Sequence, residues 1–148
     1  MNILADTCFW ISLCDPTESE HLETLAMMGK ILDDRRHLIL VPHPVLYETL
    51  CSTMVKKPDQ VKRLVYYFSL VKQVSDAAYV QKAYRLVEQQ ANRDKGTASM
   101  VDIAIMLMAD DVKNNVKAIL TRNGRDFANF CQKRGMPMIE NMAILKTI

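Results

Sequence analysis

The sequence predicts a three-layer α/β/α fold built around a central, mostly parallel sheet of four to five strands. Short, mostly apolar segments of strand length occur at residues 2–5, 38–41, 116–120 and 137–139, and the continuous apolar run at 38–41 is typical of a strand that is buried on both faces. The longer segments between these runs carry apolar residues at helical spacing. Strands that alternate with helices indicate a layered fold with a parallel sheet.

The first part of the chain predicts a strand, a turn and a helix. Residues 2–5 form the strand, which ends at Asp6, and residues 20–33 form the helix. We expect the core face of this helix to be its apolar stripe at helical spacing, namely Leu22, Leu25, Ala26, Gly29 and Leu32.

The middle of the chain predicts a second strand and three helices. Pro42 ends the strand at residues 38–41, and a proline at the first turn suits the helix expected over residues 44–55. Two further amphipathic helices are expected over residues 61–68 and 80–91.

The last part of the chain predicts a long buried helix, a strand and a short helix. Residues 97–99 cap the long helix, which runs over residues 100–112. The strand at residues 116–120 follows. A short helix over residues 126–133 then ends at Gly135, a typical C-terminal stop.

The composition predicts one globular domain that spans residues 1–148. Hydrophobic residues make up 49% of the chain and charged residues 24%, which excludes a disordered protein. The net charge of +2 means that a nucleic acid would have to be held by local patches. We see no leader and no apolar run of membrane-spanning length, so we expect a soluble, cytoplasmic protein. The four scattered cysteines favour neither a disulfide framework nor a zinc site.

Asp6 and Asp102 are the acids whose positions are most informative. Asp6 directly follows an apolar strand, and ligands of parallel sheets bind outside the carboxyl ends of the strands. Asp102 lies in the segment 100–109, where the other nine residues are apolar, so its carboxylate needs a cation or a hydrogen-bond network. Each acid also has a simpler interpretation, as a turn or helix-capping residue for Asp6 and as a helix-dipole partner for Asp102.

Two further segments have polar residues that we expect at the same edge of the sheet. Glu48 lies in the second turn of the helix after the second strand, where a solvated face is the simpler interpretation. The loop that follows the strand at residues 116–120 carries Thr121, Asn123 and Asp126, and Asp126 could equally cap the next helix. A parallel fold can bring these groups and Asp6 to one rim, and such a cluster of acids suits a hard divalent cation.

The residues resemble the PIN-domain family, which includes the ribonuclease toxins of VapC-type toxin–antitoxin pairs. Four segments carry the resemblance, in order and at suitable spacing: residues 4–7, 41–48, 99–104 and 120–127. The last segment is similar to the family's T-x-[DN]-x-x-[DE]-F loop. The resemblance extends over residues 4–139 and implies a PIN-like fold.

The resemblance also implies a metal site and a reaction. Asp6, Glu48 and Asp102 would bind Mg²⁺ or Mn²⁺, and a metal-activated water would hydrolyse RNA. Many relatives have Asp where this chain has Asn123, so either Asp126 completes the catalytic acids or a second metal binds weakly. Two residues would orient ligands or a water, Thr7 and Thr121.

Basic residues near these acids are candidates for contacts with RNA phosphates. Arg122 and Arg125 flank the loop, and Arg93 and Lys95 precede the long helix. The family also implies two protein partners, a cognate antitoxin and a second copy of the chain in a homodimer. The apolar helices between residues 61 and 87 could dock either one.

Several functions stay open at the level of the sequence. The leading hypothesis is a toxin-like endoribonuclease. The chain could instead be a PIN nuclease of RNA maturation or repair. It could also be a non-catalytic PIN-like module that binds RNA or protein, an alternative that Asn123 keeps open. An unrelated receiver-like domain that binds one Mg²⁺ is disfavoured, because no paired acids follow the first strand.

Overall fold

A parallel sheet of five strands forms the centre of the computed structural model, which describes residues 1–92 and 98–148. The strand order is β3-β2-β1-β4-β5, and every neighbouring pair is parallel. This confirms the predicted α/β class and a sheet of four to five strands. The strands are β1 (Asn2–Ala5), β2 (Leu38–Pro42), β3 (Lys72–Val74), β4 (Val116–Leu120) and β5 (Met138–Ile139).

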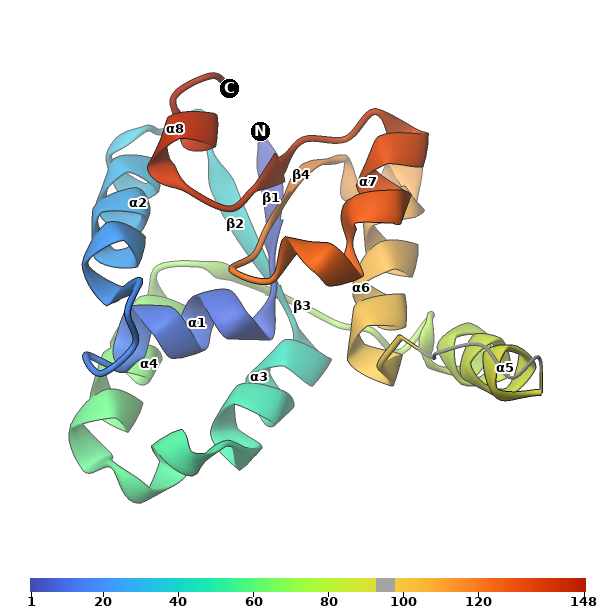
Figure 1. Ribbon diagram of the computed structural model, residues 1–148, viewed down its shortest axis with the longest axis horizontal. Coiled ribbons are helices and arrows are strands. Elements are labelled where there is room, and N and C mark those ends of the chain that lie inside the picture. The colour runs from blue at the N-terminus through green and yellow to red at the C-terminus, as the bar shows by residue number, and fades with distance from the viewer. Residues whose placement is uncertain (93–97) are drawn as a thin grey trace.

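Helices cover both faces of the sheet. The chain builds β1, β2 and β3 outward and then returns to add β4 and β5 on the other side of β1, so right-handed crossovers place the early and late helices on opposite faces. Figure 1 shows α1, α2 and α4 on one side of the sheet and α6 and α7 on the other. The α-helices are α1 (Thr7–Cys14), α2 (His21–Asp33), α3 (His43–Cys51), α4 (Pro58–Ser69), α5 (Val80–Ala91), α6 (Met100–Asp110), α7 (Ala128–Arg134) and α8 (Met142–Leu145), and the 3-10 turns are η1 (Thr53–Lys56), η2 (Val112–Asn114) and η3 (Gly124–Asp126).

Three elements were not predicted from the sequence. Helix α1 is apolar nearly all round, so it lacks the amphipathic period that reveals a helix. Strand β3 lies at the edge of the sheet and has only three residues, two of them exposed and polar. Helix α8 has four residues and forms where α2 offers a surface to pack against.

The predicted core face of α2 is wrong. Leu22 is 80% exposed and Leu32 is 39% exposed, whereas the buried residues are His21, Thr24, Met27, Met28 and Ile31. Two faces of this helix carry apolar residues at helical spacing, so the period alone does not choose between them. Hydrogen bonds to α1 decide the orientation, because Thr24 and His21 both bind Ser12, through its hydroxyl (3.1 Å) and its carbonyl oxygen (2.9 Å).

The core lies on both sides of the sheet and is dense in aromatic contacts. Trp10 of α1 is fully buried and packs edge-on against Phe68 of α4, with ring centroids 4.8 Å apart. All four cysteines are free thiols. Within the described residues, no helix combines the length and the apolar character needed to cross a membrane.

An ion pair between Asp15 and Lys57 joins the end of α1 to the start of α4 (2.9 Å). The hydrogen bonds from Lys57 and Thr17 hold the pKa of Asp15 well below its usual range. Because this pKa is lower in the folded than in the unfolded state, the pair stabilises the fold above about pH 4 and loses its effect as the pH falls.

We expect Asp15→Asn to lower the free energy of unfolding at pH 7 by about 1–3 kcal/mol, since the variant loses a charge-assisted hydrogen bond. The difference from wild type should shrink below about pH 4. Urea unfolding at a series of pH values measures both quantities. A deficit of the same size at about pH 7 and about pH 3 would contradict the assignment.

Candidate metal centre

The carboxyl ends of β1 and β4 create the candidate site. These strands are neighbours in the sheet, and the backbone N–H of Asp6 donates to the carbonyl oxygen of Leu120 (2.9 Å). Asp6 and Thr121 are therefore adjacent although they are far apart in the sequence. A cavity of about 530 Å³ opens beside them and is lined by Asp6, Thr7, Cys8, Ile11, Glu48, Cys51, Ser52, Ser99, Asp102, Asn123 and Asp126. Four acids that are far apart in the sequence therefore line one cavity, and whether they share a cation stays a prediction.

Asp6 lies at the bottom of the site and is held by several donors. Its side chain is the N-cap of α1, where Oδ1 accepts a hydrogen bond from the backbone N–H of Thr7 (2.6 Å). Oδ2 accepts hydrogen bonds from the Thr121 hydroxyl (2.9 Å) and from the Cys8 thiol. The residue is only 4% exposed. The two interpretations of Asp6 are therefore compatible, because one side chain both caps α1 and lines the cavity.

The Thr121 hydroxyl connects two backbone segments at the site. It donates to Asp6 and accepts from the backbone N–H of Asn123 (3.0 Å), and Thr121 is fully buried. We expect Thr121→Val to lower the free energy of unfolding by about 1–3 kcal/mol, because it leaves a buried N–H and a carboxylate oxygen without their partner.

If the site cleaves RNA with a metal ion, as the resemblance of the sequence implies, Thr121→Val should also lower cleavage about tenfold, as for residues that orient metal ligands. Thr121→Ser keeps the hydroxyl and is the matched control, so it should retain most of the activity. Thermal unfolding and a single-turnover cleavage assay measure the two effects. Equal activity for the valine and serine variants would argue against an orienting role.

Glu48 reaches the cavity from the second turn of α3. Its Oε2 accepts a hydrogen bond from the Thr7 hydroxyl, so Thr7 links Glu48 to Asp6 through its side chain and its backbone N–H. Glu48 is exposed on the cavity side. The fold therefore turns this residue toward the other acids instead of leaving it on a separate solvated face.

Asp102 lies in the first turn of α6 and takes part in a capping box with Ser99. The Ser99 hydroxyl accepts from the backbone N–H of Asp102 (3.0 Å), and the Asp102 side chain accepts from the backbone N–H of Ser99 (3.2 Å). Burial raises the pKa of Asp102, the bonds with Ser99 oppose this shift, and the charges of Asp6 and Asp126 raise the pKa further. Asp102 therefore interacts electrostatically with two other carboxylates of the cavity.

The loop between β4 and α7 supplies the remaining polar groups. The side-chain amide of Asn123 donates to Asp126 Oδ2 (2.6 Å), and both residues line the cavity. Asp126 belongs to η3 and precedes α7, so it is not the side-chain cap of that helix. The structure therefore places a fourth carboxylate at the cavity, bound to the side-chain amide of Asn123.

The charged side chains among the described lining residues of the cavity are all acidic. Four carboxylates line it, and among the described lining residues there is no lysine, arginine or histidine. These acids do not form a ready ligand set, since no group of three His, Cys, Asp or Glu side chains within residues 1–92 and 98–148 lies close enough to hold a metal ion. Glu48, Asp102 and Asp126 are instead each tied to a neighbouring polar group. Side-chain rotations would be needed to bring them together.

The predicted role of Arg122 in binding phosphate does not fit its position. Its side chain is 6% exposed and is paired with Glu20 and Glu23 of α2, away from the cavity. Successive residues point to opposite sides of an extended segment, so Thr121 bonds to Asp6 and Asn123 lines the cavity, whereas Arg122 meets α2. Arg125 is 88% exposed in its side chain, near Asp126. Arg93, Lys95 and Thr97 lie outside the described residues.

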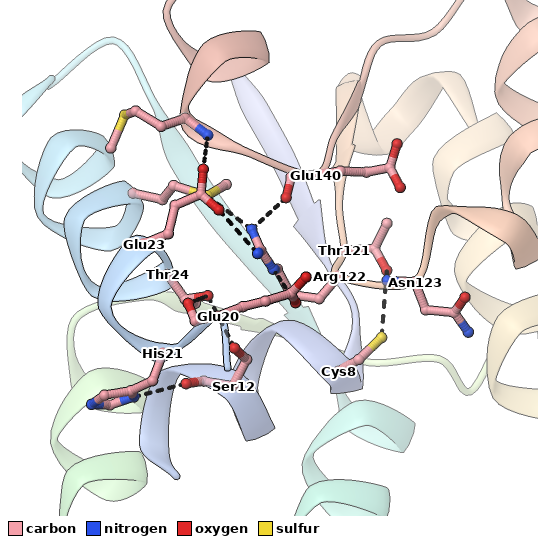
Figure 2. A network of polar contacts seen from close by, with 12 residues as sticks. Cys8, Ser12, Glu20, His21, Glu23, Thr24, Thr121, Arg122, Asn123 and Glu140 are labelled. Carbon is pink, nitrogen blue, oxygen red and sulfur yellow. Dashed lines mark hydrogen bonds and ion pairs between the residues drawn. The ribbon is translucent and has the colours of Figure 1, made fainter. Parts of the chain in front are cut away.

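Cys8 was missed from the sequence as a neighbour of the site. It lies in the first turn of α1, where its thiol donates to Asp6. The thiol also contacts the Thr121 hydroxyl (Figure 2). Burial and the adjacent Asp6 carboxylate raise the pKa of the thiol to about 11. The thiol therefore stays protonated and acts as a donor to Asp6. A residue two positions after a strand-end acid could have been recognised as a neighbour only if α1 had been predicted.

Comparisons with known proteins identify the fold. No family model matches the chain, and a search of curated proteins finds no match. Among solved structures, the chain is similar to VapC20 of Mycobacterium tuberculosis, described as a sarcin–ricin loop cleaving toxin. The TM-score is 0.64 and the identity 18%, over 86% of this chain and 94% of that one. The chain has the PIN-domain fold of VapC toxins.

A second solved structure supports the PIN-like fold. It is VapBC2 from Rickettsia felis, bound to a DNA fragment from its promoter, with a TM-score of 0.60 and 15% identity over 93% of this chain and 97% of that one. The two matches each span nearly the whole of the compared chain, so the likeness concerns the complete PIN-like domain. The fold expected from the resemblance of the sequence is therefore confirmed.

Proposed function

We propose that this chain is a divalent-metal-dependent endoribonuclease that hydrolyses RNA phosphodiesters and acts as the toxin of a toxin–antitoxin pair. One observation carries the proposal. Carboxylates from four separate parts of the chain, Asp6, Glu48, Asp102 and Asp126, line one cavity that has no basic side chain among its described lining residues. Uncompensated acids at close range repel one another, and a divalent cation removes this repulsion.

The chemistry of the donors fits Mg²⁺ or Mn²⁺. The lining offers carboxylate, amide and hydroxyl oxygens, which hard cations prefer. Asp6, Glu48 and Asp102 are the residues that would hold the ion, and Asp126 would supply the charge that Asn123 lacks. When bound, the ion supplies a water of lowered pKa and a positive charge beside the leaving oxygen.

The residues of the chain would prepare the site in distinct ways. Asp6 is oriented on both carboxylate oxygens, by Thr7 and by Thr121, so it is the most fixed of the acids. Asp102 is held by the backbone N–H of Ser99 and its pKa is raised, so a neighbouring cation would favour its charged form. Glu48 has one oxygen engaged by the Thr7 hydroxyl. Rotation of Glu48 and Asp102 toward Asp6 would complete the ligand set.

RNA is the substrate that we propose. VapC20, which shares the fold, is described as cleaving the sarcin–ricin loop, a structured RNA. Arg125 is exposed at the edge of the site and is the remaining candidate for a contact with a phosphate. Neither a histidine nor a lysine lies in the described lining to activate the 2′-hydroxyl of RNA, so we favour attack by water.

Protein partners also belong to the proposal. VapBC2, the second structural relative, is a toxin–antitoxin assembly by name, and it was solved on promoter DNA. Helices α3 and α4 of this chain expose large apolar side chains, among them Tyr47 (64%), Val65 (59%) and Tyr66 (61%). An antitoxin or a second copy of the chain, giving a homodimer, would cover such a surface.

Cleavage of labelled structured RNA by the purified protein tests the proposed function. We expect cleavage with Mg²⁺ or Mn²⁺, none with EDTA, and products without a 2′,3′-cyclic phosphate. Mass spectrometry of the product ends distinguishes this outcome from attack by the 2′-hydroxyl. Cleavage that persists in EDTA, or cyclic phosphate ends, would overturn the proposed mechanism.

A non-catalytic PIN-like module is the second candidate, and one observation favours it. In the described part of the chain, no three potential metal ligands lie close together. By the resemblance of the sequence, Asn123 also stands where many relatives have an acid. Such a module would bind RNA or a protein partner without cutting RNA. Tight RNA binding with no cleavage in Mg²⁺ or Mn²⁺, over a range of structured RNAs, would decide in favour of the module.

A further inference from the structure

A buried ion-pair cluster around Arg122 lies just behind the candidate metal centre (Figure 2). The guanidinium group donates through Nε to Glu20 Oε2 (2.7 Å) and through Nη2 to Glu23 Oε2 (3.1 Å). Nη1 donates to the carbonyl oxygen of Glu140. The Arg122 side chain is 6% exposed, whereas the side chains of Glu20 and Glu23 are 47% and 42% exposed.

This cluster joins three segments of the chain that are far apart in the sequence. Glu20 and Glu23 belong to the start of α2, Arg122 follows β4, and Glu140 follows β5. Glu23 extends the connection, because its Oε1 accepts from the backbone N–H of Met142 (3.0 Å). The Arg122 cluster therefore holds the end of β4 from the side that faces away from the cavity.

The same end of β4 holds the candidate ligands on its other side. Thr121 donates to Asp6 Oδ2 (2.9 Å) and accepts from the backbone N–H of Asn123 (3.0 Å). The Asn123 side chain in turn donates to Asp126 (2.6 Å). Any shift of Arg122 relative to α2 would move its two chain neighbours and, through them, the Asp6 and Asp126 carboxylates.

The energetics of ion pairs indicate that this cluster contributes more to geometry than to stability. A buried ion pair is weak evidence for stability, because the desolvation of the charges offsets much of their attraction. Apolar side chains of similar volume often serve stability equally well. What the planar guanidinium adds is direction, since it fixes several acceptors in one geometry.

We infer that Arg122 is a positioning residue, which holds the end of β4 so that Thr121, Asn123 and Asp126 keep their places around Asp6. This inference rests on the proposed metal-dependent function. Glu20 and Glu23, which do not line the cavity, act on the site only through Arg122.

Removal of the whole cluster tests the inference without leaving a buried charge unpaired. The variant Arg122→Met/Glu20→Gln/Glu23→Gln is compared with wild type in two measurements, Mn²⁺ affinity by calorimetric titration and amide hydrogen exchange at Asn123. We expect Mn²⁺ to bind about tenfold more weakly, as for other residues that support metal ligands, and Asn123 to exchange faster. Glu23→Gln alone is a milder second variant, in which the same changes should be smaller.

The matched control removes an ion pair elsewhere. Arg134→Met/Asp110→Asn deletes a pair of 2.7 Å between α7 and α6 that does not touch the end of β4. We expect wild-type Mn²⁺ affinity and wild-type exchange at Asn123 in this variant. Equal effects in the control and in the Arg122 variant, or no change in either measurement for the Arg122 variant, would overturn the inference. If wild-type protein binds no Mn²⁺, the proposed function fails instead, and the exchange rates alone decide whether Arg122 holds the strand end.

Discussion

Asp102→Asn is expected to lower RNA cleavage by more than about 100-fold while making the metal-free protein more stable. The loss of activity follows from removing a proposed metal ligand, and it should exceed the losses caused by supporting residues. The gain in stability follows from charge. Burial and the carboxylates of Asp6 and Asp126 raise the pKa of Asp102, against the opposing bonds with Ser99, so its ionised form is disfavoured in the folded state.

The pH dependence gives this prediction a definite sign. A carboxyl whose pKa is raised by folding destabilises the fold as the pH rises through its folded-state pKa. Asparagine keeps an oxygen that can accept from Ser99 but carries no charge. We therefore expect the melting temperature of metal-free Asp102→Asn to exceed that of wild type by about 1–3 °C at pH 7, with no gain below the usual aspartate pKa of about 3.9. The favourable helix dipole at this position, about 0.3–1 kcal/mol, works against the gain.

Thermal unfolding in EDTA and a cleavage assay measure the two effects. Asp110→Asn is the matched control, because Asp110 ends the same helix α6 but is paired with Arg134 away from the cavity. This control should keep the activity and should not become more stable. An active Asp102→Asn protein would contradict a ligand role for Asp102. An Asp102→Asn protein less stable than wild type would show that the Asp6 and Asp126 carboxylates do not repel Asp102.

Adding Mn²⁺ is expected to raise the melting temperature of wild-type protein by about 5–10 °C at a hundredfold excess over its dissociation constant. Binding to the folded state alone stabilises it by about 2.7 kcal/mol at that excess. Each kilocalorie per mole corresponds to about 2–4 °C for a domain of this size. The repulsion among Asp6, Asp102 and Asp126, which the ion would remove, is the physical source of the effect.

The Mn²⁺ shift should depend on the cavity acids and on no others. We expect it to disappear in Asp6→Asn and to be retained in Asp110→Asn, which has the same change of charge at the end of α6, away from the cavity. Differential scanning fluorimetry over a series of Mn²⁺ concentrations measures it. A shift that survives in Asp6→Asn would place the ion elsewhere on the protein, and the absence of a shift in wild type would remove the metal from the proposal.

Much of the fold could be predicted because the strands are marked locally. The segments at β1, β2 and β4 are mostly apolar and of strand length, and the glycine at the end of α7 has the positive φ (59°) that a C-terminal stop favours. Helix α1 and strand β3 lacked such marks. The first is buried on most of its surface and the second is a short, polar edge strand, so both form because of the neighbours that they contact.

The candidate site could be predicted only in part. Asp6 and Asp102 were recognisable because a charge in apolar surroundings requires an explanation. Glu48 and Asp126 were not distinguishable from surface acids, and only their position at the cavity sets them apart. Arg122 was misassigned, because its neighbours Thr121 and Asn123 reach Asp6 and the cavity while its own side chain meets α2.

The sequence by itself determined the order of the locally marked strands and helices, without α1, β3 and α8, and the positions of the acids along the chain, since these depend on local apolar pattern and on residue type. The tertiary structure alone decided which side each polar group faces. Asp6 and Thr121 meet because β1 and β4 are hydrogen-bonded neighbours, and α2 turns His21 and Thr24 inward because Ser12 offers them partners. Such choices depend on contacts between segments distant in sequence, and the local pattern of residues carries no information about them.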